Sequence, residues 1–293
     1  MTRARAWILA SRPKTLPASA VPVIVGSAVA ASEGAFVLLP ALVALLCALL
    51  IQISTNLAND YFDFLKGADT ERRLGPVRVT QSGLIPPATV RNAMLGVIAL
   101  TFVLGMYLVS VAGWPILVVG VVSLICAVAY TAGPWPLAYV GLGDVFVFVF
   151  FGIVAVTGTH YVQALRFSPA ALLASLSPGA ISTAILVVNN YRDIDTDRDV
   201  GKKTLAVRIG KSATRVEFKM LLAFAYLVPV AQVAALHASP WLLLPLATLP
   251  LALPIVRLVD TAEGAPLNRC LAMTGRLLFA FGALSSAGWM LGR

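Results

Sequence analysis

Nine apolar stretches, most of them long enough to cross a lipid bilayer, dominate this 293-residue chain. An α-helix needs about 20 apolar residues to span the hydrocarbon core of a membrane. A soluble domain carries about 25% charged residues, whereas this chain is 59% hydrophobic and only 12% charged. The sequence therefore predicts an all-α, polytopic transmembrane bundle of nine helices rather than one or more soluble domains.

Hydrophobic periodicity places these helices at residues 16–32, 36–60, 88–111, 114–131, 143–164, 171–192, 214–236, 240–259 and 270–290. Two of the connections are long and polar, at residues 61–87 and 193–213, whereas the others are short. We interpret the chain as a single transmembrane domain, residues 1–293, in which the two long loops cap an active site.

The 22 Lys and Arg residues are distributed unevenly over the predicted connections. When the N-terminus is placed inside, only Arg166 and Arg293 fall on the outer side. The positive-inside rule then predicts a multi-pass protein of the cell (inner or plasma) membrane, with a cytoplasmic N-terminus, both long loops cytoplasmic and the C-terminus outside. This bias also explains the net charge of +9. We therefore expect the lipid bilayer as surroundings, and neither a nucleic-acid ligand nor an obligate protein partner.

The second and the sixth predicted helices end alike, because each is followed by an acidic cluster and then by a basic loop. This internal echo predicts two four-helix repeats followed by a ninth helix. Coincidence would produce a similar echo, so the matched chemistry of the two loops is the observation that favours a repeat.

Most of the 13 acidic residues of the chain lie in these two clusters. Their members are Asp60, Asp63, Asp69 and Glu71 in the first, and Asp193, Asp195, Asp197 and Asp199 in the second. Acidic loops that merely face water are common. Two matched clusters that are each led by asparagines at the membrane surface indicate a shared chemical role instead.

Helical spacing predicts which side chains of the first cluster share a face. If the second helix continues to Asp63, then Asn56, Asp60 and Asp63 lie on one face, at positions i, i+4 and i+7. Asn59 stands one turn before Asp63.

The second cluster has the same spacing. Asn189, Asp193 and Asp197 recur every four residues and are expected to line one helical face. Asp195 and Asp199 point elsewhere and are expected to be bystanders.

Carboxylates stacked at the end of a helix repel each other and meet the negative end of the helix dipole, so a structural role explains them poorly. Mg²⁺ takes oxygen ligands and is usually bound by one or two carboxylates together with water and substrate phosphates. Zinc is disfavoured, because neither cluster has a set of His and Cys residues nearby in the sequence. We predict that Asn56, Asn59, Asp63, Asn189, Asp193 and Asp197 are the metal ligands, and that Asp60, Asp63, Asp193 and Asp197 are the catalytic carboxylates.

Basic side chains flank both clusters and are suited to the oxygens of a diphosphate. The candidates are Lys66, Arg72, Arg78, Lys202 and Arg208. The alternative for individual members is that they only set the membrane topology.

The paired motifs resemble those of the UbiA superfamily of intramembrane aromatic prenyltransferases, and more closely its menaquinone-pathway branch, which acts on 1,4-dihydroxy-2-naphthoate. The matching blocks are Arg12-Pro13-Lys14-Thr15-Leu16-Pro17, Asn56-x-x-Asn59-Asp60-Tyr61-x-Asp63 and Asn189-Asn190-x-Arg192-Asp193-x-x-x-Asp197-x-x-x-Gly201-Lys202. The superfamily's first motif often reads Asn-Asp-x-x-Asp-x-x-x-Asp, but here Gly67 occupies the final position and Asp69 follows two residues later. The resemblance therefore assigns ligands most directly at Asn59, Asp63, Asp193 and Asp197.

The resemblance implies an Mg²⁺-dependent aromatic prenyltransferase whose substrates are a polyprenyl diphosphate and a small aromatic acid. Neutralising the diphosphate makes it a good leaving group, and an apolar chamber protects the allylic cation from water. A ring carbon of 1,4-dihydroxy-2-naphthoate then attacks with loss of CO₂ and diphosphate, giving a demethylmenaquinone.

Four further residues are candidates for binding the anionic aromatic acceptor. Arg12 and Lys14 are expected to meet its carboxylate, and Tyr130 or Tyr139 to stack on its ring or hydrogen-bond to it. The alternatives are lipid-headgroup anchoring for the two basic residues and an interfacial aromatic belt for the tyrosines.

Three other functions have related sequence signatures. A related prenyltransferase acting on 4-hydroxybenzoate or homogentisate has the same motifs. A CDP-alcohol phosphotransferase requires an Asp-Gly-x-x-Ala-Arg core that this sequence lacks. A membrane cation transporter is expected to place its carboxylates near the bilayer midplane rather than at one face.

Overall fold

A computed structural model describes residues 2–68 and 74–292 of the chain. These residues form helices and connections without a strand. The elements are α1 (Arg3–Ser11), η1 (Pro13–Thr15), α2 (Leu16–Ser32), α3 (Leu38–Leu65), α4 (Pro87–Ala112), α5 (Trp114–Ala129), α6 (Gly143–Phe148), η2 (Val149–Val154), α7 (Ala155–Ala164), α8 (Pro169–Arg192), α9 (Ile194–Asp199), α10 (Leu205–Leu236), η3 (Pro240–Thr248), α11 (Leu249–Thr261) and α12 (Leu267–Leu291).

Eight helical segments of the described residues are long and apolar enough to cross a membrane. The 16-residue α5 is apolar but shorter. Together these segments match the nine predicted helices, so the prediction of a polytopic helical bundle is confirmed. The protein is a multi-pass membrane protein.

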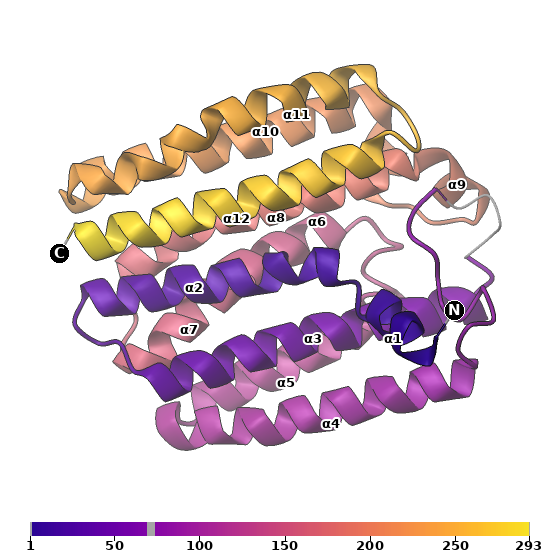
Figure 1. Cartoon of the computed structure of the whole chain (residues 1–293), viewed down its shortest axis with the longest axis horizontal. Helices are drawn as coiled ribbons and strands as arrows, with labels where there is room; N and C mark the ends of the chain where they lie inside the picture. The colour runs from indigo at the N-terminus through magenta and orange to yellow at the C-terminus, as the bar shows by residue number, and fades with distance from the viewer. Residues whose placement is uncertain (1, 69–73, 293) are drawn as a thin grey trace.

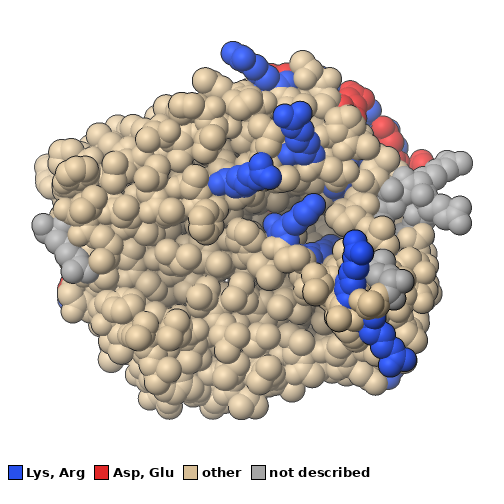
Figure 2. All heavy atoms as spheres, viewed as in Figure 1, with Lys and Arg blue, Asp and Glu red and all other residues tan. Residues whose placement is uncertain are grey.

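The long helices lie side by side, and Figure 1 shows both predicted cytoplasmic loops at the same end of the bundle. The N-terminus and α9 lie at this end, which we call the site end, and the C-terminus lies at the opposite end. On the face shown in Figure 2, charged side chains gather toward the site end, and most of the remaining surface is uncharged. A surface of this kind suits a bundle surrounded by lipid.

The helices extend further into the polar sequence than hydropathy predicts. α3 continues to Leu65 instead of ending at residue 60, and α10 begins at Leu205 instead of residue 214. α9 is a further helix inside the predicted loop 193–213, and α1 precedes the first predicted span. Apolar length measures only the membrane-crossing part of a helix, so it underestimates helices that project beyond the membrane.

The packing order is consistent with two repeats. α3 packs most extensively on α4, and α8 packs most extensively on α10, which are the equivalent pairs of two four-helix units. α8 is the most enclosed of the spans, and its Ile181 and Val188 belong to a core shared with α2, α10, α11 and α12. This central position holds the end of α8, and with it the second acidic cluster, firmly in place.

The fifth predicted span is a continuous helix with a π-helical segment, η2, between α6 and α7. η2 packs closely on α8 through two glycines. A Cβ atom at Gly152 would lie 2.7 Å from the Cα atom of Gly179. Only glycine permits this approach, which brings the wall of α6 and η2 against the helix that carries the second motif.

Candidate active site

A chamber of about 1210 Å³ lies between the helices and reaches the site end. Most of its wall is apolar, with side chains such as Ile51, Phe150, Phe151 and Val154. Its polar end includes many of the predicted site residues, namely Arg12, Lys14, Asn56, Asn59, Asp63, Arg78, Tyr130, Asn189, Asp193, Asp197 and Lys202. The fold therefore brings residues from both motifs and from the N-terminal arm to one cavity.

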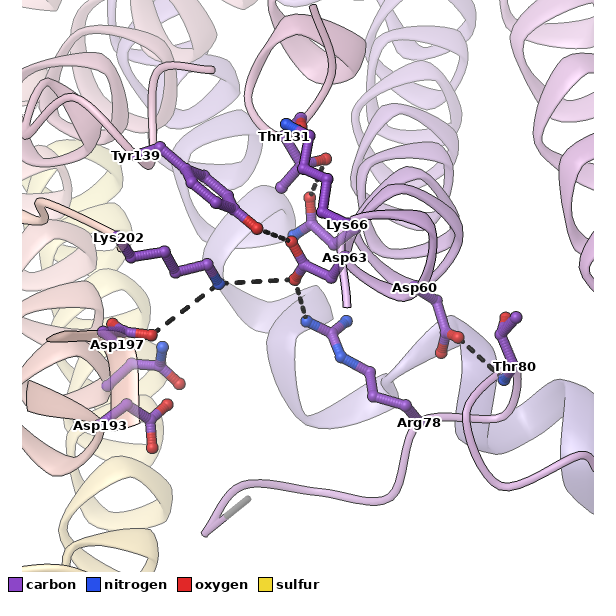
Figure 3. A network of polar contacts seen from close by, with 12 residues as sticks. Asp60, Asp63, Lys66, Arg78, Thr80, Thr131, Tyr139, Asp193, Asp197 and Lys202 are labelled. Carbon is purple, nitrogen blue, oxygen red and sulfur yellow. Dashed lines mark hydrogen bonds and ion pairs between the residues drawn. The ribbon is translucent and has the colours of Figure 1, made fainter. Parts of the chain in front are cut away.

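Asp63 has more polar side-chain contacts than Asp60, the other carboxylate of the first cluster that the structure describes, and only 1% of the residue is exposed. It accepts hydrogen bonds from the Arg78 guanidinium, at 2.8 Å, and from the Tyr139 hydroxyl, at 2.9 Å. The Nζ atom of Lys202 lies 3.6 Å from its Oδ2 atom. Figure 3 shows Asp63 at the centre of these contacts.

Lys202 connects the two clusters. Its Nζ atom also lies 3.9 Å from Oδ1 of Asp197, so one ammonium group stands between a carboxylate of each motif (Figure 3). Gly201, at φ +75°, turns the chain directly before this lysine. The two clusters thus face each other across a distance that a single lysine side chain spans.

The spacing of the second cluster predicted that it lies on one uninterrupted helix. The structure instead shows a break within it. α8 ends at Arg192, Asp193 follows with φ −98° and ψ 7°, and α9 starts at Ile194. The Asp197 N–H donates to the Asp193 carbonyl at 2.7 Å, which keeps the two residues one turn apart. Both side chains line the chamber despite the break.

Asp60 has a different position from the other predicted catalytic carboxylates, because it does not line the chamber. Its two oxygens accept hydrogen bonds from the N–H groups of Val79 and Thr80, at 3.1 and 2.9 Å. At about 100° per residue, Asp60 is rotated about 60° from Asp63 on α3. That rotation directs it toward the segment after residue 74 rather than into the chamber.

The predicted asparagine ligands are held by neighbouring groups. Asn56 donates to the carbonyl of Ser11 and to Oγ1 of Thr15, at 3.0 and 3.1 Å, and so attaches the N-terminal arm to α3. Asn59 accepts a hydrogen bond from the Thr131 hydroxyl at 3.1 Å. Both asparagines line the chamber.

The predicted diphosphate-binding residues separate into two groups. Arg78 and Lys202 line the chamber, whereas Lys66 and Arg208 do not. Lys66 donates to the Thr131 carbonyl at 2.6 Å, and burial lowers its pKa. Arg208 is exposed and donates to the carbonyls of Lys203 and Val140. Arg72 lies outside the described residues, as do Asp69 and Glu71.

The two tyrosines also differ. Tyr130 lines the chamber at the C-terminal end of α5. Tyr139 lies behind Asp63, with the ammonium groups of Lys66 and Lys202 4.6 and 4.8 Å from its ring centre. It supports the carboxylate instead of lining the cavity.

The sequence did not indicate the roles of Arg192 and Asn268. Arg192 belongs to the second motif but was given no role at the site, yet it donates to both carboxylate oxygens of Asp193, at 2.8 and 2.6 Å. Asn268, at the start of α12, accepts a hydrogen bond from Arg192 at 2.7 Å. The position of Arg192 in its motif, between Asn189 and Asp193, was the only available signal.

The donor set fits a hard cation that is shared with a substrate. Within residues 2–68 and 74–292, no three His, Cys, Asp or Glu side chains are close enough to form a metal cage by themselves. The chamber end instead presents separate carboxylate and amide oxygens on both sides. Mg²⁺ is commonly bound in this way, by one or two carboxylates and the oxygens of a phosphorylated ligand.

Comparison with known proteins gives a family match over most of the chain. The UbiA prenyltransferase family matches residues 19–286. The 1,4-dihydroxy-2-naphthoate octaprenyltransferase of Escherichia coli is 39% identical over 300 residues, covering 98% of this chain and 97% of the relative. The enzyme of the same name from Mycobacterium tuberculosis is 39% identical over 292 residues, covering 95% and 98%. A solved UbiA homolog from Archaeoglobus fulgidus, bound to DMAPP and Mg²⁺, has a TM-score of 0.67 at 15% identity, over 96% of this chain and 99% of that one.

The fold is that of the intramembrane prenyltransferases, and the chain belongs to the UbiA prenyltransferase family. The resemblance found in the motifs is therefore confirmed. The helical bundle is shared with solved members of the family, one of which binds Mg²⁺ together with a prenyl diphosphate.

Proposed function

We propose that this protein transfers a polyprenyl group from polyprenyl diphosphate to 1,4-dihydroxy-2-naphthoate, with loss of CO₂ and diphosphate, giving a demethylmenaquinone in its reduced, hydroquinone form. The observation that carries the proposal is the meeting of Asp63 and Asp197 at the polar end of one apolar chamber, with Lys202 between them. The naphthoate acceptor is supported by the names of relatives that are 39% identical over nearly the whole chain.

Mg²⁺ would be held by Asp63, Asp193 and Asp197, with Asn59 and Asn189 beside them, and when bound it would neutralise charge on the departing diphosphate. Arg78 and Lys202 line the same end of the chamber and would pair with the remaining diphosphate oxygens. Asp60 takes a positioning role in this proposal, because its oxygens are occupied by backbone N–H groups.

The apolar chamber would hold the prenyl tail and exclude water from the allylic cation. Part of its wall is formed by three phenylalanines of α6 and η2, namely Phe146, Phe150 and Phe151. Aromatic faces carry a negative quadrupole that favours nearby positive charge. The acceptor ring would then attack the cation from within the same cavity.

The acceptor would lie against the N-terminal arm. Arg12 and Lys14 line the chamber and are suited to its carboxylate, and Tyr130 offers its hydroxyl to a ring oxygen. Loss of the carboxylate as CO₂ would restore the aromatic ring after the new carbon–carbon bond has formed. We further propose that the protein lies in the cell membrane with its site end facing the cytoplasm, because Lys and Arg residues concentrate at that end.

The test is prenyl transfer by the purified protein in detergent or liposomes, with polyprenyl diphosphates of mixed length and Mg²⁺. Separate reactions receive 1,4-dihydroxy-2-naphthoate, 4-hydroxybenzoate or homogentisate, and the lipid products are identified by mass spectrometry. The expected product is a decarboxylated prenyl naphthohydroquinone, detected as such or as the quinone that forms from it by oxidation in air, and it should be lost with EDTA and restored by added Mg²⁺. A product from only one of the other acceptors would replace the naphthoate assignment while leaving prenyl transfer intact.

A further inference from the structure

Arg192 uses its guanidinium almost entirely within the protein. The side chain is 0% exposed. Its Nε and one terminal nitrogen donate to the two oxygens of Asp193, at 2.8 and 2.6 Å. The same terminal nitrogen donates to the Asn189 amide oxygen at 2.9 Å, and the other donates to the Asn268 amide oxygen at 2.7 Å. Two of its three partners are therefore proposed metal ligands.

Such a fork does not prevent Asp193 from binding a cation. A carboxylate has about four lone-pair sites, and the two bonds from Arg192 occupy one on each oxygen. The planar guanidinium also fixes the plane of the carboxylate, which a single point charge such as lysine cannot do. Because Arg192 is the last residue of α8, and α8 is the most enclosed span, this orientation is tied to the core of the bundle.

Asn268 connects Arg192 to the segment that begins at Leu74. Its amide nitrogen donates to the Leu74 carbonyl at 2.9 Å, although the two residues are 194 positions apart. Leu74, Arg192 and Asn268 all line the chamber. Four residues after Leu74, Arg78 binds Asp63 at 2.8 Å.

These bonds form a chain that starts at one motif and ends at the other. It runs from Asp193 through Arg192 and Asn268 to the segment at residues 74–78, and from there to Asp63. The chain closes around the polar end of the chamber.

We infer that Arg192, together with Asn268, is a positioning residue that orients Asp193 and Asn189 for Mg²⁺-diphosphate and holds the segment at residues 74–78 against the second motif. The inference rests on the proposed function of the site. Hydrogen-bond partners of metal ligands typically change metal affinity or activity by about 10- to 100-fold when they are removed. Asn268 extends this role to α12, far from either motif in the sequence.

The experiment compares wild type with Arg192→Gln, Arg192→Lys and a matched control, Arg198→Gln. Arg198 lies in the same motif, but its side chain is 60% exposed and pairs with Asp195 at 3.7 Å. Each purified protein is heated with a fixed concentration of geranyl diphosphate and increasing Mg²⁺, and the Mg²⁺ concentration that gives half of the thermal shift is measured. Steady-state kcat and KM are measured in parallel.

Arg192→Gln is expected to raise the half-saturating Mg²⁺ concentration about 10- to 100-fold and to lower kcat. Arg192→Lys should recover part of the loss, and Arg198→Gln should match wild type. A normal Mg²⁺ response in folded Arg192→Gln would overturn the inference. If wild type itself shows no Mg²⁺-dependent shift with geranyl diphosphate, the proposed function of the site fails as well, so the two failures are distinguishable.

Asn268→Ala is a second variant, which tests the inference even if Arg192→Gln does not fold. This change removes the bridge to Leu74 but leaves the fork on Asp193. It should weaken geranyl diphosphate binding several-fold. Combined with Arg192→Lys, the two losses should be non-additive, because both act through one chain of bonds. Fully additive losses, or unchanged binding in Asn268→Ala, would contradict the coupling.

Discussion

Asp63 receives two kinds of contact that set its chemistry. A buried carboxylate is costly unless it is paired, and Asp63 meets Arg78, Lys202 and the Tyr139 hydroxyl. Asp193 is paired by Arg192 alone among the described residues, through a two-bond fork. Each of these two proposed metal ligands therefore lies beside at least one positively charged side chain.

Removing the charge of these carboxylates is therefore expected to abolish activity. Asp63→Asn and Asp193→Asn should each lower prenyl transfer on the order of 100-fold or more, while the protein still inserts into membranes. Asp195→Asn is the matched control, since Asp195 is exposed and pairs with Lys211 at 3.1 Å. Transfer of a radiolabelled prenyl group in isolated membranes measures the effect. Near-normal turnover in both site variants would sink the metal-diphosphate assignment.

Asp60 leads to a different expectation, because its neighbours are backbone N–H groups. An asparagine at position 60 would keep one acceptor oxygen for one of these N–H groups and would place its own NH₂ group against the other. Asp60→Asn should therefore destabilise the protein by about 1–3 kcal/mol. Thermal unfolding in detergent checks this, and the folded fraction should keep the Mg²⁺ dependence of wild type. A shifted Mg²⁺ dependence with normal stability would instead make Asp60 a metal ligand.

At the scale of elements, the carboxylate of Glu33 connects several helices at the end of the bundle opposite the site. Glu33, at the end of α2, accepts hydrogen bonds from Ser168 at 2.6 Å and Arg166 at 2.7 Å, and the Nε2 atom of His160 lies 3.0 Å from it. Burial alone would raise the Glu33 pKa, but these three partners together lower it. The cluster ties α2 to α7 and to the connection that leads into α8.

A lowered folded-state pKa sets the sign of a pH effect. The stabilisation by Glu33 is fully present above its unfolded pKa, near 4.5, and is lost as the pH falls through the lower folded pKa. Glu33→Gln should lose about 1–3 kcal/mol at neutral pH and should lose less further stability on acidification. The control is Glu263→Gln, whose half-exposed ion pairs with Lys211 and Arg215 contribute at most about 1 kcal/mol. Thermal unfolding between neutral and acidic pH measures both variants, and equal acid sensitivity in Glu33→Gln and wild type would contradict the assignment.

Element boundaries show where hydropathy stops being informative. The start of α2 at Leu16 and its end at Ser32 agree with the predicted span. The continuation of α3 beyond residue 60 was considered only as far as Asp63, and the helix reaches Leu65. The separate helix α9 was not predicted, because most of its residues are polar and give no hydropathy signal. The π-helical segment η2 has no hydropathy signal either, and it contains Gly152, which packs closely on Gly179 of α8.

At the scale of the whole molecule, the chamber limits which prenyl chains fit. Gly158 of α7 lines the chamber, and a Cβ atom there would meet no heavy atom within 4 Å. Gly158→Leu should therefore fill part of the apolar space and disfavour the longest chain by about 1–3 kcal/mol. Gly96→Leu is the control, because Gly96 is equally open but does not line the chamber. Mass spectrometry of products from mixed polyprenyl diphosphates should show a shift to shorter chains only in Gly158→Leu, and an unchanged distribution would place the tail elsewhere.

Sequence alone was enough to recognise the membrane bundle, its spans, the two motifs and the family, because apolar length and local spacing are properties of adjacent residues. Tertiary structure decided which side chains meet. It turned Asp60 away from the chamber, placed Lys202 between Asp63 and Asp197, and brought Asn268 to Arg192. Helical periodicity specifies angles within one helix, whereas contacts between residues far apart in the chain depend on how the helices pack.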